Sequence, residues 1–430
     1  MTAPWDTRPE NAPRASDRLA RRGLFAVAGG LAAAVGTGFA AGAAMPDAAP
    51  RPQKPTEDFW GAHQGGIVTP AQDHTYFAAF DLTTEKRDEV AKLLQVWTAA
   101  AARMTAGATA APPAADLNAP GSDSDEALGL APARLTLTFG FGAGMFEKAG
   151  KDRYGLASLR PAALIDLPRF NGDQLMAART GGDLSVQACA DDPQVAFHAV
   201  RQLARLAYDF AEIRWTQAGF QSRPAKGGTP RNLMGFKDGT HTPQYVDKVV
   251  WVGDDGPAWM RGGSYVVVRR IRMALEHWDR TNVGFQEQTM GRHKLSGAPL
   301  GLKDEFAPLG LDRTDNDENP IIPENAHVRL ANAASNDGAE ILRRGYSYND
   351  GVNFTAERWP PWRQGMEYDA GLLFVAYQRD PRTGFVKIFE NMAKFDMLNQ
   401  FVTHTGGGLF ACPGGMREGE FIGQRLFASA

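Results

Sequence analysis

Hydrophobic residues follow two alternating patterns along the chain after its first 58 residues. Short runs of mostly apolar residues predict β-strands over 75–82, 135–140, 184–189 and 211–216. Apolar residues spaced three or four apart predict amphipathic helices over 85–104 and 193–210. The stretch 105–132 is rich in Ala, Pro, Gly and Ser, has neither pattern, and is expected to be a loop. The predicted order of elements in this half is strand, helix, two strands, helix, strand.

The rest of the chain repeats much of this order. Strands are predicted over 264–271, 371–377 and 408–412, and helical segments over 273–279 and 386–400. A long irregular insertion is expected from about 281 to 369. Strand–helix–strand–strand–helix–strand is the order of ferredoxin-like domains. We therefore predict an α+β fold of two duplicated ferredoxin-like halves, 59–245 and 246–430, each with an antiparallel sheet and peripheral helices. No residue-level repeat accompanies this architectural duplication.

The first 58 residues differ from the rest in composition. Residues 1–22 are polar and end in the pair Arg21-Arg22, and residues 23–44 are uncharged and rich in Ala and Gly. This pattern predicts a signal peptide over 1–44, followed by a flexible lead-in over 45–58. The arginine pair is similar to that of twin-arginine export signals, so we expect a periplasmic or extracellular protein. Retention of the apolar run as a membrane anchor is the alternative. Its mild hydrophobicity favours cleavage, which would leave no stable membrane span.

Composition and charge exclude several classes of protein. The hydrophobic content of 43% is enough for a buried core. The net charge is −3, and no basic block follows the first 25 residues, so we expect no nucleic-acid partner. The two cysteines, Cys189 and Cys412, fit neither a CxxC metal site nor a c-type haem attachment. We expect two buried free thiols, with a disulfide between them as the alternative.

A short glycine-bracketed loop carries the first candidate chemistry. In Asn232-Leu-Met-Gly-Phe-Lys-Asp-Gly-Thr240, Gly235 and Gly239 enclose Phe236, Lys237 and Asp238. Glycine is favoured where the backbone needs a positive φ, so the Asp238 carboxylate is expected on a tight turn. Asp-Gly is also a very common turn dipeptide, so a plain turn is the alternative.

Two later segments resemble, together with this loop, the haem site of the dye-decolourising peroxidases. They are 325–330, which holds His327, and 341–348, which holds Arg343-Arg344-Gly-Tyr-Ser-Tyr348. The resemblance is closest to the secreted branch that includes the deferrochelatases, and it extends from 59–64 to 404–413. It implies one non-covalent haem b per chain, bound in the C-terminal half. The cofactor-binding residues it implies are Gly235, Phe236, Lys237, Gly239, His327, Arg343 and Asp396.

The resemblance also implies a role for each charged residue. His327 would be the proximal ligand of the haem iron. His241 is the alternative ligand, because it lies only three residues from Asp238. The ligand and the acid would then share one loop, whereas they must lie on opposite faces of the porphyrin. Asp238 would be the distal acid/base, and Arg343 a fixed positive charge that polarises the peroxide bond. The alternatives are a turn carboxylate for Asp238 and a surface ion pair for Arg343. Arg344 would be a partner of a haem propionate or a surface residue.

Other residues around the site follow less directly. A ligating histidine usually donates its second N–H to a carboxylate or carbonyl. Asp396 occupies the family position for this partner, and Glu390 is the alternative. The loop continues as His241-Thr-Pro243, where the family pattern has an Asn-Pro step. Tyr346, Trp359 and Trp362 are candidates for relaying electrons.

The function that the resemblance implies is a haem b peroxidase. It would reduce hydrogen peroxide and oxidise a small-molecule reductant, such as a dye-like or phenolic compound. Three alternatives remain at this point: a deferrochelatase that releases iron from haem, a haem-binding or haem-delivery protein without turnover, and a secreted binding module without haem. The sequence is also compatible with a homo-oligomer.

Overall fold

The computed structural model describes residues 56–113, 116, 118–224, 227–243, 245–355 and 365–429. The predicted signal peptide, most of the predicted lead-in, Trp359 and Trp362 lie outside these residues. Where the chain is described, no helix has the length and apolar character that crossing a membrane requires.

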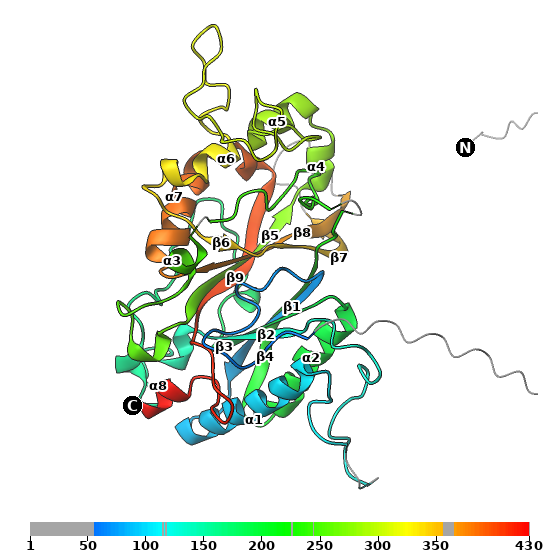
Figure 1. The fold of residues 1–430 in the computed structure, drawn as a ribbon, viewed down its shortest axis with the longest axis vertical. Helices are drawn as coiled ribbons and strands as arrows, with labels where there is room; N and C mark the ends of the chain where they lie inside the picture. Colours follow the sequence, from blue (N-terminus) through cyan, green and yellow to red (C-terminus); the bar gives the residue numbers. More distant parts are fainter. Residues whose placement is uncertain are drawn as a thin grey trace, which may run out of the picture. The chain divides into compact units, whose positions relative to one another are not determined.

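The first half forms four antiparallel strands in the order β2-β3-β1-β4. The strands are β1 (His74–Leu82), β2 (Thr136–Phe141), β3 (Leu184–Ala190) and β4 (Ala211–Phe220). Helices α1 (Arg87–Thr105) and α2 (Pro193–Leu206) lie beside them at one end of Figure 1. Helix α2 begins as predicted: Pro193 is its first residue, and the Asp192 side chain accepts hydrogen bonds from two backbone N–H groups. All six predicted elements are present, although β4 extends four residues beyond the predicted end.

The second half forms four longer strands in the order β9-β5-β8-β7. They are β5 (Ser264–Met273), β7 (Tyr346–Thr355), β8 (Gly365–Gln378) and β9 (Val402–Cys412), with the two-residue β6 (Leu342–Arg343) beside β8. The helices are α3 (Val246–Val250), α4 (Leu275–Asp279), α5 (Val283–Met290), α6 (His327–Leu330), α7 (Lys387–Phe395) and α8 (Gln424–Ala428).

Two predictions for this half were wrong in part. The expected irregular insertion contains α5, α6, β6, β7 and the start of β8. Strand β7 was not predicted, because Asn349-Asp350-Gly351 interrupts its apolar residues. The register of its pairing with β8 shifts at the same residues. The predicted helix 386–400 ends at Phe395, because Asp396 adopts an extended backbone and caps the following 3₁₀ turn (Met397–Gln400).

Hydrogen bonds join the two groups of strands into one closed sheet. Phe141 of β2 pairs with Ala411 of β9, and Phe220 of β4 pairs with Ser347 of β7. Pairing of β5 with both β8 and β9 completes the ring. The predicted α+β class with antiparallel strands and surrounding helices is confirmed. The prediction of two separate sheets was wrong, because one residue pair at each of the two junctions joins them into a single sheet.

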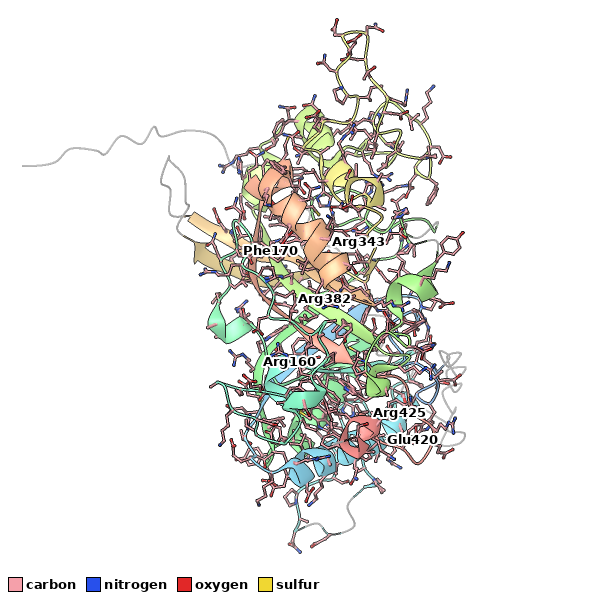
Figure 2. The ribbon with its side chains drawn as sticks, turned by 90° about the vertical axis from the view of Figure 1, so that its left-hand side faces the viewer. Arg160, Phe170, Arg343, Arg382, Glu420 and Arg425 are labelled. Carbon is pink, nitrogen blue, oxygen red and sulfur yellow. The ribbon has the colours of Figure 1, made fainter. Side chains whose placement is uncertain are left out.

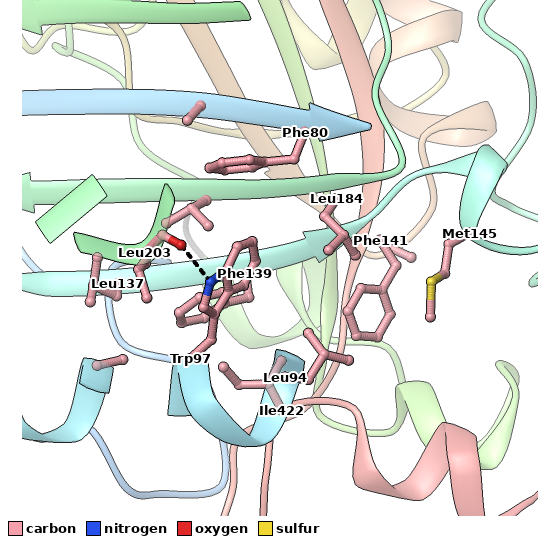
Figure 3. Close-up of a cluster of buried hydrophobic side chains, with 14 of the residues drawn as sticks. Phe80, Leu94, Trp97, Leu137, Phe139, Phe141, Met145, Leu184, Leu203 and Ile422 are labelled. Carbon is pink, nitrogen blue, oxygen red and sulfur yellow. Dashed lines mark hydrogen bonds between the residues drawn. The ribbon is translucent and has the colours of Figure 1, made fainter. Parts of the chain in front are cut away.

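The largest hydrophobic core lies between α1 and the strands of the first half (Figure 3). Trp97 on α1 is 1% exposed, and its ring centroid lies 5.2 Å from that of Phe80. Its indole N–H donates to the Leu203 carbonyl of α2 at 2.8 Å. The apolar face predicted for this helix is therefore buried. Both cysteines are buried free thiols, as expected.

One buried histidine makes the acid stability of the fold testable. His404 on β9 is buried, and burial together with the charge of Arg269 lowers its pKa to about 3. In the unfolded chain a histidine titrates near pH 6.5, so between these values the unfolded state binds more protons. This residue should therefore cost stability progressively as the pH falls from about 6.5 towards 3.

We expect His404→Leu to flatten this dependence by about 1.4 kcal/mol per pH unit. Urea unfolding at several pH values between 7 and 4 measures the difference between wild type and variant. Equal acid sensitivity in the two proteins would contradict the assignment.

Candidate active site

His327 and Asp396 form one side of the candidate site. His327 is the first residue of α6, and Asp396 lies directly after α7. The His327 Nδ1 and the Asp396 Oδ2 are 2.7 Å apart, while the Asp396 Oδ1 accepts the Leu398 N–H at 2.8 Å. The Asp396 carboxylate is thus held by backbone and imidazole together. The alternative partner Glu390 has no such contact with His327 among the described residues.

The Asp396 carboxylate sets the protonation of the His327 ring. Burial by itself lowers the pKa of His327, but the charge of Asp396 and its hydrogen bond outweigh burial, so the pKa is raised. A carboxylate can only accept, so Nδ1 carries the proton in this pair. Nε2 of the neutral imidazole is then the nitrogen left for a metal.

Asp238 and Arg343 form the other side of the site. Arg343 lies on β6, and its Nη1 donates to the Asp238 Oδ1 at 3.0 Å. Figure 2 places Arg343 in the part of the chain that carries α7, away from Arg425 on α8. The charges of Asp238 and Arg343 both act on the pKa of His327. The two pairs, which are far apart in the sequence, therefore lie close enough to interact electrostatically, although only Asp238 and Arg343 of the four residues line the cavity beside β6.

The glycine-bracketed loop has the expected backbone. Gly235 has φ +85° and Gly239 has φ +109°, a region that favours glycine. The Asp238 N–H donates to the Pro230 carbonyl at 2.9 Å. The Phe236 side chain is buried against Trp278, and the Lys237 ammonium forms an ion pair with Glu305.

A cavity of about 320 Å³ borders the loop and β6. Asp238, Gly239, Arg343 and Phe374 line it. Gly235, Phe236 and Lys237, predicted as haem contacts, do not, because the Phe236 side chain packs inward and Lys237 pairs with Glu305. These three residues hold the loop that presents Asp238 and Gly239.

Two further basic residues border the same cavity. His241 has a 71% exposed side chain and lies 3.5 Å from Glu340, in contrast to the partly buried His327. Arg344 is not the surface residue that was one of its two predicted roles, and its predicted role as a propionate partner stays a prediction. Its guanidinium is buried and bonds to the Thr69 carbonyl and the Gln72 side chain. This arginine connects the second half of the chain to the first.

Sequence reasoning missed two residues that support the loop. The Arg231 guanidinium donates to the carbonyls of Gly235, Lys294 and Leu295 at 2.6–2.7 Å. Glu305 accepts from Lys237 and from the Thr240 hydroxyl. Arg231 directly precedes the motif, which was its only sequence signal. Glu305 lies far along the chain in an irregular stretch that gave none.

Comparison with known proteins shows the family to which the chain is similar. Models of the Dyp-type peroxidase N-terminal and C-terminal domains match residues 64–221 and 229–417. A dye-decolorizing peroxidase of Thermobifida fusca is 39% identical, over 98% of this chain and 99% of its own. A deferrochelatase of Escherichia coli K12 is 37% identical, over 94% of each chain.

Solved structures are similar as well. Ferric DtpA from Streptomyces lividans superposes with a TM-score of 0.79 at 42% identity, covering 87% of this chain and 98% of that one. A DyP-type peroxidase from Cellulomonas bogoriensis gives a TM-score of 0.77 at 37% identity, covering 87% and 99%. The chain therefore belongs to the Dyp-type peroxidase family.

Proposed function

We propose that this chain is a haem b peroxidase that reduces hydrogen peroxide and oxidises a small dye-like or phenolic reductant. The observation that supports the proposal is the presence of two polar pairs whose charges interact. Arg343–Asp238 combines a permanent cation with a proton-exchanging carboxylate. His327–Asp396 presents an oriented imidazole. This donor set provides the three parts that a haem peroxidase needs.

The residues present fit a haem. With Nδ1 of His327 engaged by Asp396, Nε2 can serve as the proximal ligand. The cavity beside Asp238 and Arg343 has apolar lining from Leu372 and Phe374. When bound, haem supplies the redox chemistry that cleaves the peroxide O–O bond. Over a full cycle, one hydrogen peroxide takes two electrons and two protons from the reductant and yields two waters.

The chain's own side chains move one proton and hold one charge. Asp238 accepts a proton from one peroxide oxygen and returns it to the other, which departs as water. The Arg343 guanidinium stays protonated and stabilises the negative charge that develops as the bond breaks. Asp396 fixes the tautomer and orientation of His327 and raises its basicity. Gly239 lets the loop backbone approach the bound molecule closely.

Release of iron from haem is the second candidate, favoured by the 37% identity to proteins named deferrochelatase. It would use the same cavity and the same histidine. A haem carrier without turnover has no use for an acid–cation pair such as Asp238–Arg343. The acid–cation pair therefore favours an enzyme over a carrier.

The architecture and destination of the chain complete the proposal. We infer a duplicated ferredoxin-like arrangement of 59–245 and 246–430, supported by the matching strand orders β2-β3-β1-β4 and β9-β5-β8-β7. We also infer export by the twin-arginine route, supported by Arg21-Arg22 and the apolar run after it. Assembly into a homo-oligomer stays a prediction.

The experiment that tests the function measures both candidate reactions on one preparation. The purified chain is loaded with haemin and mixed with a dye, with and without peroxide. Dye absorbance and porphyrin fluorescence are then followed together. We expect stoichiometric haem, a Soret band, peroxide-dependent loss of dye colour and no metal-free porphyrin. Porphyrin release without dye oxidation would favour the deferrochelatase. A chain that does not bind haemin would contradict both candidate functions.

A further inference from the structure

A second cluster of ligand-type side chains lies in the first half, on different elements from the haem site. Asp123 and Glu126 come from the long loop before β2, and His198 comes from α2. Asp123 Oδ1 is 3.5 Å from His198 Nε2, and Glu126 Oε1 is 3.3 Å from His198 Nδ1. One ligand atom from each residue can be chosen so that all three lie within 4.8 Å of one another.

Each ring nitrogen of His198 faces a carboxylate oxygen, Nε2 that of Asp123 and Nδ1 that of Glu126, and the contact at Nδ1 is not aligned as a hydrogen bond. His198 is 4% exposed, and its Nδ1 has no hydrogen-bond partner among the described residues. The Glu126 Oε1 that faces it is also buried and makes no aligned hydrogen bond there, although the Arg201 guanidinium lies 3.2 Å away. Buried polar atoms normally have partners, and the few that lack them point to an ion or a water. A cation between the two atoms would satisfy both.

The two carboxylates are held in place from behind. Asp123 Oδ1 accepts the Asp125 N–H at 2.9 Å, and Asp123 Oδ2 accepts the Ala110 N–H at 2.6 Å. The Ser124 hydroxyl donates to Glu126 Oε2, which leaves Oε1 directed at His198. These bonds arrange the oxygens before any ligand arrives.

Space and charge around the cluster also suit a small cation. A cavity of about 50 Å³ borders His198, although neither carboxylate lines it, and it is large enough for a water. The Arg201 guanidinium lies 3.2 Å from Glu126 Oε1 and competes for it. Its side chain is 48% exposed, so it can turn into solvent when a cation takes its place.

We propose that Asp123, Glu126 and His198 bind a divalent transition-metal ion of the zinc class. One imidazole nitrogen with two carboxylates suits Zn²⁺ and its neighbours, whereas Ca²⁺ and Mg²⁺ prefer oxygen alone. Bonds of about 2.0–2.2 Å in a tetrahedral site separate the ligand atoms by roughly 3.3–3.6 Å. The 3.3 Å between His198 Nδ1 and Glu126 Oε1 falls in this range. The Asp123 oxygen faces the other ring nitrogen, so it has to move towards Nδ1 to join the same ion. Two carboxylates also neutralise the charge of the ion.

The ion would fasten the long loop to α2. Hydrogen bonds from Gln202 to Ser124 and from Arg205 to Gly121 already join the loop from 106 to 135 to α2. A metal that joins residues 123 and 126 to residue 198 restricts this loop in the folded chain. The expected role is therefore structural and separate from peroxide chemistry.

The test is calorimetric titration of Zn²⁺ into the full, haem-loaded, untagged chain. Wild type should bind one Zn²⁺ per chain, and His198→Gln should weaken this binding at least tenfold. His293→Gln is the matched control, because His293 pairs with Glu287 at 2.9 Å and belongs to no three-residue cluster in the described chain. Circular dichroism and the Soret band verify the fold of each variant.

Two results would overturn the proposal. One is equal Zn²⁺ binding by wild type and His198→Gln. The other is no Zn²⁺ binding by wild type, which would leave His198 as a bridge between two carboxylates. If His198→Gln does not fold, anomalous diffraction from wild-type crystals soaked in Zn²⁺ tests the site instead. An anomalous peak between the three side chains supports the site, and its absence rejects it.

Discussion

Replacing Arg343 by leucine is expected to slow the reaction with hydrogen peroxide by about 10²–10³-fold, the usual cost of removing one group that stabilises developing charge. The guanidinium reaches into the site from β6 and bonds to Asp238 at 3.0 Å. Leucine fills part of the same volume but offers neither charge nor donors. No other described side chain contacts Asp238 in this way, so nothing takes over the lost charge.

Asp238→Asn should be less severe, because water in the cavity can carry a proton while no solvent molecule replaces a fixed cation. Stopped-flow mixing with peroxide measures the two rate constants, and Arg343→Lys serves as a control that keeps the charge. Because the two side chains touch, the double variant is needed to separate their contributions. Equal rates for Arg343→Leu and Asp238→Asn, or the reverse order, would discard the ranking.

Asp396→Asn is expected to lower activity or haem affinity by about 10–100-fold, as losses of such supporting partners typically do. Asparagine keeps the shape and can still accept the Leu398 N–H, so α7 and the turn after it should be preserved. It cannot supply the negative charge that raises the pKa of His327. The imidazole becomes a weaker electron donor, and the midpoint potential of the iron should rise.

Glu390→Gln provides the matched control on the adjacent helix. Glu390 lies on α7 and was the other carboxylate considered as a partner of His327. Spectroelectrochemistry should show a shifted potential for Asp396→Asn and none for Glu390→Gln. A shifted potential in Glu390→Gln but not in Asp396→Asn would show that Glu390, and not Asp396, supports His327. Unchanged midpoint potentials in both variants would show that Asp396 only caps the 3₁₀ turn after α7.

The sequence predicted the first half of the fold well because each element carries its own pattern. Helix α1 places Val90, Leu93, Leu94 and Trp97 on one buried face, and short apolar strands flank it. The second half was harder, because β7 is broken by polar residues at its bulge and owes its conformation to β8. Closure of the sheet through Phe141–Ala411 and Phe220–Ser347 depends on pairs between distant segments, which local patterns do not contain.

The sequence predicted which residues supply the chemical groups of the site, but not how their neighbours are oriented. Asp238, His327, Arg343 and Asp396 were named from a motif resemblance, and the structure brings them together as two pairs, Asp238 with Arg343 and His327 with Asp396. Their roles remain predictions. Local reasoning failed where a side chain's direction depends on tertiary contacts. Lys237 turns to Glu305, and Arg344 turns inward to Gln72. The sequence alone does not specify either contact.

The central claim is that His327 holds the haem opposite Asp238 and Arg343. The most direct test compares absorption spectra of wild type and His327→Ala, each purified after haem supplementation and then mixed with peroxide. We expect wild type to show a histidine-ligated haem spectrum that responds to peroxide, and the variant to lose both. A variant that keeps the wild-type spectrum would contradict the account, because another histidine, His241 first, would then be the ligand.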